Sequence, residues 1–307
     1  VRNPCLSKPQ GNYHRLSLGR INPMVTKVPK DIINAVNAAG MNKAEMSIDK
    51  TLVMGFLAGA FIAFGGFLAI MVGGGIPGIK MTNPGFQKFV FGGTFPVGLM
   101  LVVIAGSELF TGNTAISVPG VLSGRIKWFA WMRNMFLSYT GNIIGSLFVA
   151  FFLAYQTELL ISEPWLSFTI GISKVKVSQS FWMLFLKGIG CNWLVCLAIW
   201  LAVASEDASG KILGIWFPIM AFVTLGFEHS VANMFFIPLG IFYGADVTWT
   251  QFFIVNLVPV TLGNIVGGSF FVGTIYWYVF EYEKPGAVAK KIRRITAPET
   301  PDLCVRV

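Results

Sequence analysis

The chain has 307 residues, of which 54% are hydrophobic and only 12% are charged, whereas soluble domains carry about 25% charged residues. This balance excludes an ordinary soluble domain and indicates an integral membrane protein. The net charge of +9 comes mostly from the two ends of the chain. Because these ends flank the apolar segments, we expect anionic lipid to be the partner of this charge, and no nucleic acid.

The chain begins with a polar, basic tail over residues 1–28, and its first 50 residues contain no secretory signal segment. Residues 29–43 are predicted to form an amphipathic helix at the membrane surface, because their aliphatic side chains share one helical face. The transmembrane domain is predicted to extend over residues 29–282, and a basic tail over residues 283–307 ends the chain.

Six apolar stretches inside this domain each exceed the roughly 20 residues that a membrane-spanning helix needs. They cover residues 51–74, 89–118, 128–155, 180–204, 211–243 and 249–280. The predicted fold class is therefore an all-α integral membrane protein with six transmembrane helices. An even number of spans puts both termini on one side, and the basic tails predict that this side is the cytoplasmic side of the plasma membrane.

A sequence pattern occurs twice inside the second and fifth spans. The frame Gly-x-Glu-x4-Asn runs from Gly106 through Glu108 to Asn113, and again from Gly226 through Glu228 to Asn233. A carboxylate at membrane depth costs about 3 kcal/mol or more, so two at matched positions indicate function. Helices interrupted at corresponding places in two halves are typical of transporter binding sites. We therefore expect broken second and fifth helices.

Other residues repeat in the same order. Asn134 and Asn142 in the first half match Asn256 and Asn264 in the second, with the same internal spacing. Glycine pairs that allow close helix packing occur at Gly55/Gly59, Gly141/Gly145 and Gly263/Gly267. Since each half has three spans, the second half is predicted to lie inverted relative to the first, about a pseudo-two-fold axis in the membrane plane.

The sequence argues against an enzyme and against a metal or other cofactor. Cys191 and Cys196 lie five positions apart in one span without metal-ligand spacing, and only His229 lies inside a span. A channel for neutral solutes such as water or ammonia also uses broken helices and stays as the alternative. However, the chain has no Asn-Pro-Ala pair or paired pore histidines, and the lysines ahead of the spans favour anions.

The two segments that begin at Gly106 and Gly226 resemble the signature segments of the formate/nitrite transporter family. The stretch Lys187-Gly-Ile-Gly-Cys-Asn-Trp resembles the fourth helix of that family, and the resemblance covers about residues 30–282. It implies an aquaporin-like protomer with its own pore, assembled as a homopentamer. It also implies transport of small monovalent anions or their acids, such as formate, nitrite, lactate, acetate or hydrosulfide.

His229 is the candidate pore residue, because imidazole can donate a hydrogen bond to a passing anion or exchange a proton; the alternative is a bracing role at the break. We expect Glu108 and Glu228 to accept hydrogen bonds from backbone N–H groups freed by the breaks, although a proton relay is also open. Lys43 and Lys176 are expected to attract anions at opposite mouths, unless they merely extend from helix ends to the membrane surface.

The resemblance implies one hydrophobic constriction formed by Leu99, Leu109 and Phe222, and a second formed by Phe95 and Phe110. Polar side chains between them could contact substrate or satisfy broken backbone: Thr111, Asn113, Asn192 and Asn233. A bare carboxylate would lose its hydration at an apolar ring. At pH 7 only about one part in a thousand of a carboxylic acid is neutral. The predicted mechanism is therefore protonation in the low-dielectric entrance, by water or His229, and passage of the neutral acid together with its proton.

Overall fold

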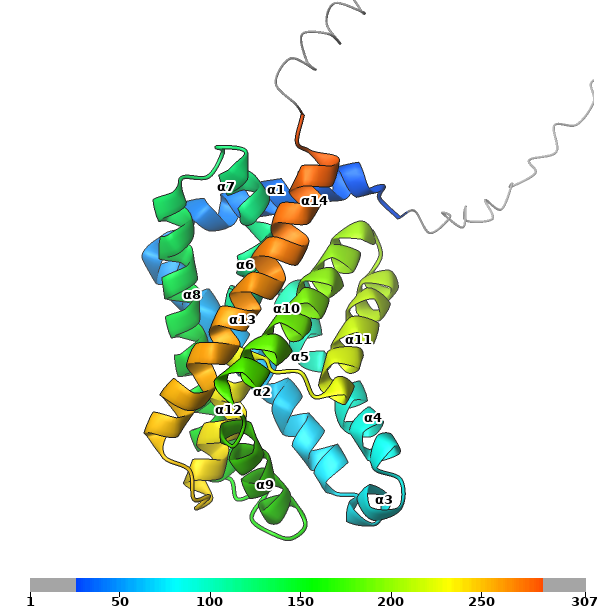
Figure 1. The fold of residues 1–307 in the computed structure, drawn as a ribbon, viewed down its shortest axis with the longest axis vertical. Coiled ribbons are helices and arrows are strands. Elements are labelled where there is room, and N and C mark those ends of the chain that lie inside the picture. The colour runs from blue at the N-terminus through cyan, green and yellow to red at the C-terminus, as the bar shows by residue number, and fades with distance from the viewer. Residues whose placement is uncertain (1–25, 284–307) are drawn as a thin grey trace, which may run out of the picture.

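A computed structural model describes residues 26–283, so nearly all of the two predicted tails lies outside the described residues. Within this range six helices are long and apolar enough to cross a membrane, which confirms the predicted fold class (Figure 1). These spans are Ile48–Gly74, Pro84–Gly106, Trp128–Tyr155, Phe181–Ala204, Ala208–Leu225 and Gln251–Phe280.

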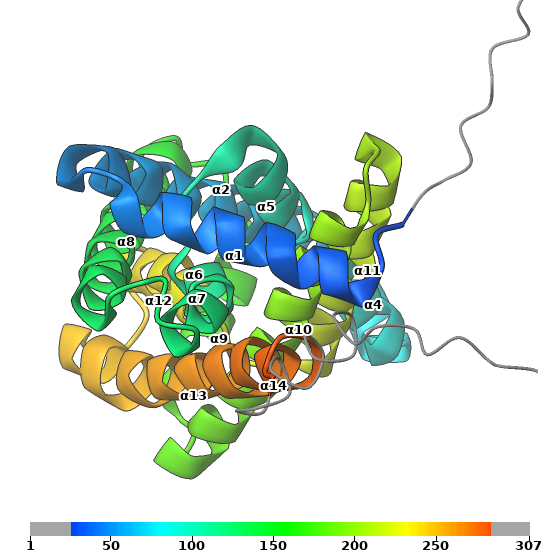
Figure 2. The same ribbon diagram turned by 90° about the horizontal axis from the view of Figure 1, so that it is seen from above.

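The first half begins with helix α1 and ends with the third span. Its helices are α1 (Pro29–Glu45), α2 (Ile48–Gly74), α3 (Pro77–Thr82), α4 (Pro84–Thr94), α5 (Val97–Met100), the π-helical η1 (Leu101–Gly106), α6 (Phe110–Ile116), α7 (Val118–Leu122), α8 (Trp128–Phe148) and η2 (Val149–Tyr155). Helix α1 lies across one end of the bundle (Figure 2).

The second half contains the remaining three spans and two shorter helices. Its helices are α9 (Trp165–Val177), α10 (Phe181–Ala204), α11 (Ala208–Leu225), α12 (Ser230–Phe242), η3 (Gln251–Leu257), α13 (Val258–Gly268), η4 (Ser269–Thr274) and α14 (Ile275–Phe280). Along the long axis, α9 lies at the end opposite α1 (Figure 1).

The predicted interruptions of the second and fifth spans are confirmed. Gly106 has φ +84° and Gly226 has φ +77°, a left-handed conformation that glycine adopts without the steric cost of a Cβ atom. After Gly106 the chain is extended at Ser107 and resumes as α6 at Phe110. After Gly226 it resumes as α12 at Ser230. Both interruptions therefore leave backbone groups without helical partners inside the bundle.

The short helix after each break packs into the other half of the molecule. Helix α6 contacts α10 and α13, whereas α12 contacts α2 and α8. The predicted close packing through glycine is also present. A Cβ atom at Gly59 would collide with the backbone of Asn142, and one at Gly267 with the backbone of Ile189. The two halves are consequently interlocked, and both breaks lie in the interior.

Helix α9 is absent from the sequence prediction, and it changes the placement of Lys176. Lys176 lies in the last turn of α9, and Lys43 lies in the last turn of α1. Both lysines therefore lie ahead of a span, each at the end of a short helix. The fully buried residues of α9 are Thr169 and Ser173, whereas its apolar residues Phe168 and Ile172 are only partly buried against the core.

Candidate functional site at the two helix breaks

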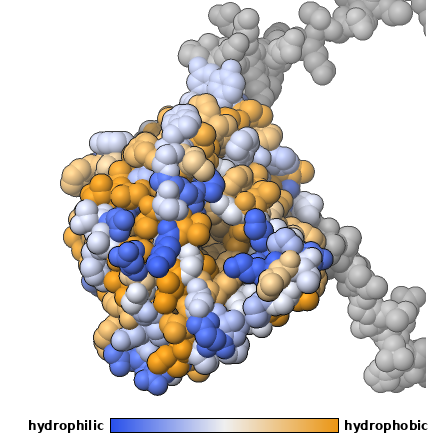
Figure 3. Space-filling view, turned by 60° about the horizontal axis from the view of Figure 1, so that its bottom comes forward, coloured by the Kyte–Doolittle hydropathy of each residue, from blue (hydrophilic) through white to orange (hydrophobic). Residues whose placement is uncertain are grey.

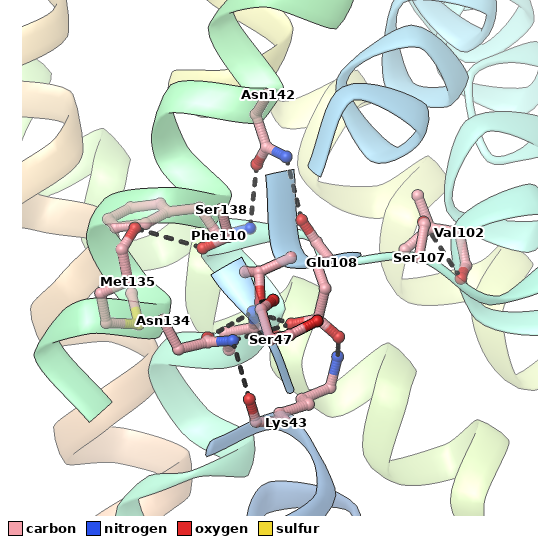
Figure 4. Close-up of polar contacts among 12 residues, drawn as sticks. Lys43, Ser47, Val102, Ser107, Glu108, Phe110, Asn134, Met135, Ser138 and Asn142 are labelled. Carbon is pink, nitrogen blue, oxygen red and sulfur yellow. Dashed lines mark hydrogen bonds and ion pairs between the residues drawn. The ribbon is translucent and has the colours of Figure 1, made fainter. Parts of the chain in front are cut away.

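The first break is organised by a buried carboxylate. Glu108 is 3% exposed, and its Oε1 lies 2.6 Å from Nζ of Lys43 (Figure 4). Its Oε2 accepts hydrogen bonds from the amides of Asn113, at 2.8 Å, and Asn134, at 3.1 Å. The Asn134 amide also donates to the backbone carbonyl of Lys43. This carboxylate thus fixes the end of α1, the start of α6 and helix α8 to one another.

The second break has the same arrangement from the second half of the chain. Glu228 is 4% exposed and lies 2.9 Å from Nζ of Lys176. Its carboxylate accepts from the amide of Asn233 at 2.7 Å, and Asn233 also donates to Asn256. Asn256 donates to the backbone carbonyl of Lys176, as Asn134 does to Lys43. The repeated residues are therefore structural equivalents.

Asparagine side chains satisfy the backbone groups that the breaks leave free. Oδ1 of Asn142 accepts the N–H of Phe110 at 2.9 Å, while its Nδ2 donates to the carbonyl of Glu108. Asn264 binds the N–H of Ser230 at 2.9 Å and the carbonyl of Glu228 in the same way. We call Asn142 and Asn264 the amide clamps.

The expectation that Glu108 and Glu228 accept these backbone N–H groups is therefore wrong. An ionised carboxylate only accepts hydrogen bonds, whereas a break frees both backbone donors and backbone acceptors. A carboxamide offers both kinds of group and can satisfy both ends. The carboxylates instead bind the lysine ammonium groups and the amides of Asn113 and Asn233.

His229 and Thr111 meet where the two breaks approach each other. His229 is the N-cap residue of α12, and its Nδ1 accepts the N–H of Ala232 at 3.1 Å. Its Nε2 lies 2.9 Å from Oγ1 of Thr111. Since Nδ1 accepts a hydrogen bond, this geometry assigns the neutral imidazole with its proton on Nε2, donated to the threonine. Both side chains are at most 3% exposed, so the protein encloses the pair.

A cavity of about 520 Å³ extends from His229 to the α9 end of the bundle. Figure 3 looks onto that end and shows hydrophilic residues around a hollow. The lining includes four lysines and one carboxylate: Lys80, Lys88, Lys176, Lys187 and Glu228. The charge excess is positive, so the cavity attracts anions.

The aromatic residues differ in grouping from the sequence expectation. Phe95 and Phe222 both line this cavity next to His229, with ring centroids 5.9 Å apart. Phe110 instead packs edge-on against Tyr139 at 4.7 Å and lines a separate apolar cavity between α8 and α13. Phe95 thus groups with Phe222 and not with Phe110. Leu99 and Leu109 are 1% and 2% exposed in the same apolar core.

Asn192 connects the two breaks. Its Nδ2 donates to the carbonyl of Thr111 at 3.1 Å and to the carbonyl of Asn264 at 2.6 Å. Asn192, Asn113 and Asn233 are thus bound within the protein, although Asn233 also lines the cavity. The amide clamps, and likewise Asn134 and Asn256, were not predicted as site residues. Their matched spacing in the two halves was the available signal.

Residues 30–278 match the family described as "Formate/nitrite transporter". The chain is 50% identical over 273 residues to a probable formate transporter of Methanothermobacter thermautotrophicus, across 83% of this chain and 97% of that protein. A solved FNT family ion channel superposes with TM-score 0.74 at 36% identity, covering 81% of this chain and 98% of that one. A pentameric formate channel with formate bound gives TM-score 0.68 at 32% identity, with coverage of 76% and 98%. The chain therefore belongs to the formate/nitrite transporter family, a family of transporters and channels and not of enzymes.

Proposed function

We propose that this protein carries formate, nitrite and related small monovalent anions across the membrane, with lactate and acetate as further substrates. The observation that carries the proposal is the hydrogen bond between His229 and Thr111 at the inner end of a positively lined cavity. The relatives named for formate and nitrite support this substrate class.

The charges of the cavity favour an anion over the alternative, a neutral solute. Lysines outnumber carboxylates four to one in its lining, and such a field raises the local concentration of anions. At the inner end, Phe95 and Phe222 offer only apolar surface. A small anion that reaches them loses hydration without compensation, so protonation to the neutral acid favours passage.

We infer that His229 acts mainly as a hydrogen-bond donor. Its one ring proton lies on Nε2. The hydrogen bond that this N–H donates can switch from Oγ1 of Thr111 to an oxygen of the substrate. A second proton would have to bind Nδ1, where it would break the hydrogen bond that caps α12. The proton of the neutral acid is therefore expected to come from water in the cavity, so that net flux follows the substrate and proton gradients together.

The repeated break geometry supports two inverted halves, with α1 and α9 at opposite ends of the bundle (Figure 1). We propose that Lys43 faces the cytoplasm and Lys176 the opposite side of the plasma membrane, with both termini cytoplasmic, and that five protomers assemble as in the pentameric relative. Single-cysteine variants at positions 43 and 176, labelled from each side, test the topology. Labelling of both positions from one side would contradict it.

The transport proposal is tested in proteoliposomes with radiolabelled formate under imposed pH gradients. His229→Phe and Thr111→Val should each lower formate flux at least tenfold, because the substrate loses a donor or its positioning partner. Tyr139→Phe is the matched control, since it removes a partly buried hydroxyl contact, to Thr261, away from the cavity. Flux that is unchanged in His229→Phe, or water or ammonia permeation without formate flux, would overturn the proposal.

The coupling to protons needs a separate measurement. Current and formate uptake are recorded in the same preparation while the external pH is varied. Passage of the neutral acid predicts little charge movement per molecule and faster uptake at lower pH on the substrate side. One elementary charge per formate, independent of pH, would mean that the bare anion crosses.

A further inference from the structure

The cavity in front of His229 is far larger than the proposed substrates. Formate and nitrite each have three heavy atoms and occupy roughly the volume of two water molecules, about 60 Å³. The cavity measures about 520 Å³, which is within the range of pockets for larger organic ligands. Attraction of a small anion needs charge at the entrance, but it does not need this volume.

Six phenylalanines contribute to the walls of the cavity. Phe91 lies 5.9 Å from Phe168 and 6.0 Å from Phe236, measured between ring centroids, and all three rings line the space. Phe227 lines it as well. Such a wall favours a flat apolar group, which gains from burial and from ring contacts.

Three of the four lysines in the lining, Lys80, Lys88 and Lys187, have no carboxylate partner within the described residues, and of these three Lys187 is the one that is not exposed. Lys176 is paired with Glu228. Lys187 is half-buried on α10, and its Nζ binds Oε1 of the neutral side chain of Gln179 at 2.6 Å. The ion pairs within residues 26–283 do not include Lys187. A carboxylate entering the cavity can therefore bind Lys187 without displacing another anion.

The inner end of the cavity stops a ligand of this size. Phe95 and Phe222 are 2% and 3% exposed and pack edge to face at 5.9 Å. A flat ring cannot pass between two rings that are already in contact. A ligand held by the aromatic wall would thus occupy the cavity and close it to smaller anions.

We propose that this cavity binds aromatic monocarboxylates, with the carboxylate at Lys187 and the ring among Phe91, Phe168 and Phe236. Such compounds bind from the α9 side, do not cross, and compete there with the transported anion. Binding itself depends only on the cavity, whereas the competition rests on the proposed transport function.

The test uses 2-naphthoate as the probe on the full-length protein in detergent, with isothermal titration calorimetry as the readout. Lys187→Gln should weaken saturable binding at least tenfold, and Phe168→Ala at least fivefold. Lys174→Gln is the matched control, since Lys174 is an exposed lysine of α9 outside the lining, and its affinity should equal that of the wild type. The neutral 2-naphthamide should bind the wild type and Lys187→Gln equally.

Saturable 2-naphthoate binding with equal affinity in Lys187→Gln, or only non-saturable partition into detergent, would overturn the proposal. The flux arm is separate: 2-naphthoate should inhibit formate uptake when added on the α9 side of oriented vesicles and not from the other side. Inhibition from both sides would contradict a ligand that cannot pass the phenylalanine pair. If no formate is transported at all, the transport proposal fails while the calorimetric test of this site stands.

Discussion

Replacement of Asn264 by leucine gives the sharpest test of the clamp at the second break. Leucine keeps the approximate shape of the side chain but removes the acceptor for the N–H of Ser230 and the donor to the carbonyl of Glu228. Both groups are buried at a break in the backbone. Each unsatisfied buried group costs about 1–3 kcal/mol, so the expected loss of stability is about 2–6 kcal/mol. Asn142→Leu should give a similar loss, because its partners at the first break match.

An ordinary hydrogen bond between membrane helices is much weaker, about 0.6 kcal/mol on average. Tyr139→Phe supplies this reference, since Tyr139 binds Thr261 across two unbroken helices. Stability is measured by titration with sodium dodecyl sulfate in mixed micelles, with helix content as the signal. If Asn264→Leu costs no more than Tyr139→Phe, the backbone at the break has other partners and the clamp reasoning is wrong.

Three further predictions use the same stability assay or thermal melts. Lys176→Met leaves the buried carboxylate of Glu228 without its cation and should lower the stability by about 3 kcal/mol or more. The double variant that also carries Glu228→Gln should recover most of this stability. A double variant as unstable as Lys176→Met alone would contradict the pairing. Gly226→Ala places a Cβ atom on a residue with φ +77° and should lower the stability by about 1–2 kcal/mol. An unchanged stability would show that the turn relaxes. The N–H of Gly210 donates to Asp207 and lowers the pKa of this carboxyl below 3.8. Asp207→Ala should therefore lower the melting temperature at neutral pH, and the difference should vanish as the pH falls through that lowered pKa; an equal difference in acid would refute it.

The sequence predicted the spans and the breaks because their signals are local. A span needs only a sufficient length of apolar residues, and a break is indicated by a glycine beside a carboxylate where neither suits an unbroken membrane helix. Gly106 and Gly226 do adopt the left-handed conformation that this interpretation requires.

The partners of the polar groups could not be predicted in the same way. Glu108 is 65 positions from Lys43, and Asn264 is 36 positions from Glu228, so these contacts depend on how separate helices pack. The matched spacing of the asparagines showed that they repeat, but not which groups they bind. Helix α9 was missed for another reason: its fully buried residues, Thr169 and Ser173, are polar, and its apolar residues Phe168 and Ile172 are only partly buried.

The exchange of α6 and α12 between the halves constrains how the chain is made. When α6 leaves the ribosome, α10 and α13, against which it packs, have not yet been synthesised. The first three spans therefore enter the bilayer before the helices that pack against α6 from the second half are present. Helix α12 meets the opposite situation, since α2 and α8 precede it. Maturation of the N-terminal half must accordingly wait for the C-terminal half, and a ribosome stalled before α10 would leave a membrane-inserted intermediate exposed to quality-control proteolysis.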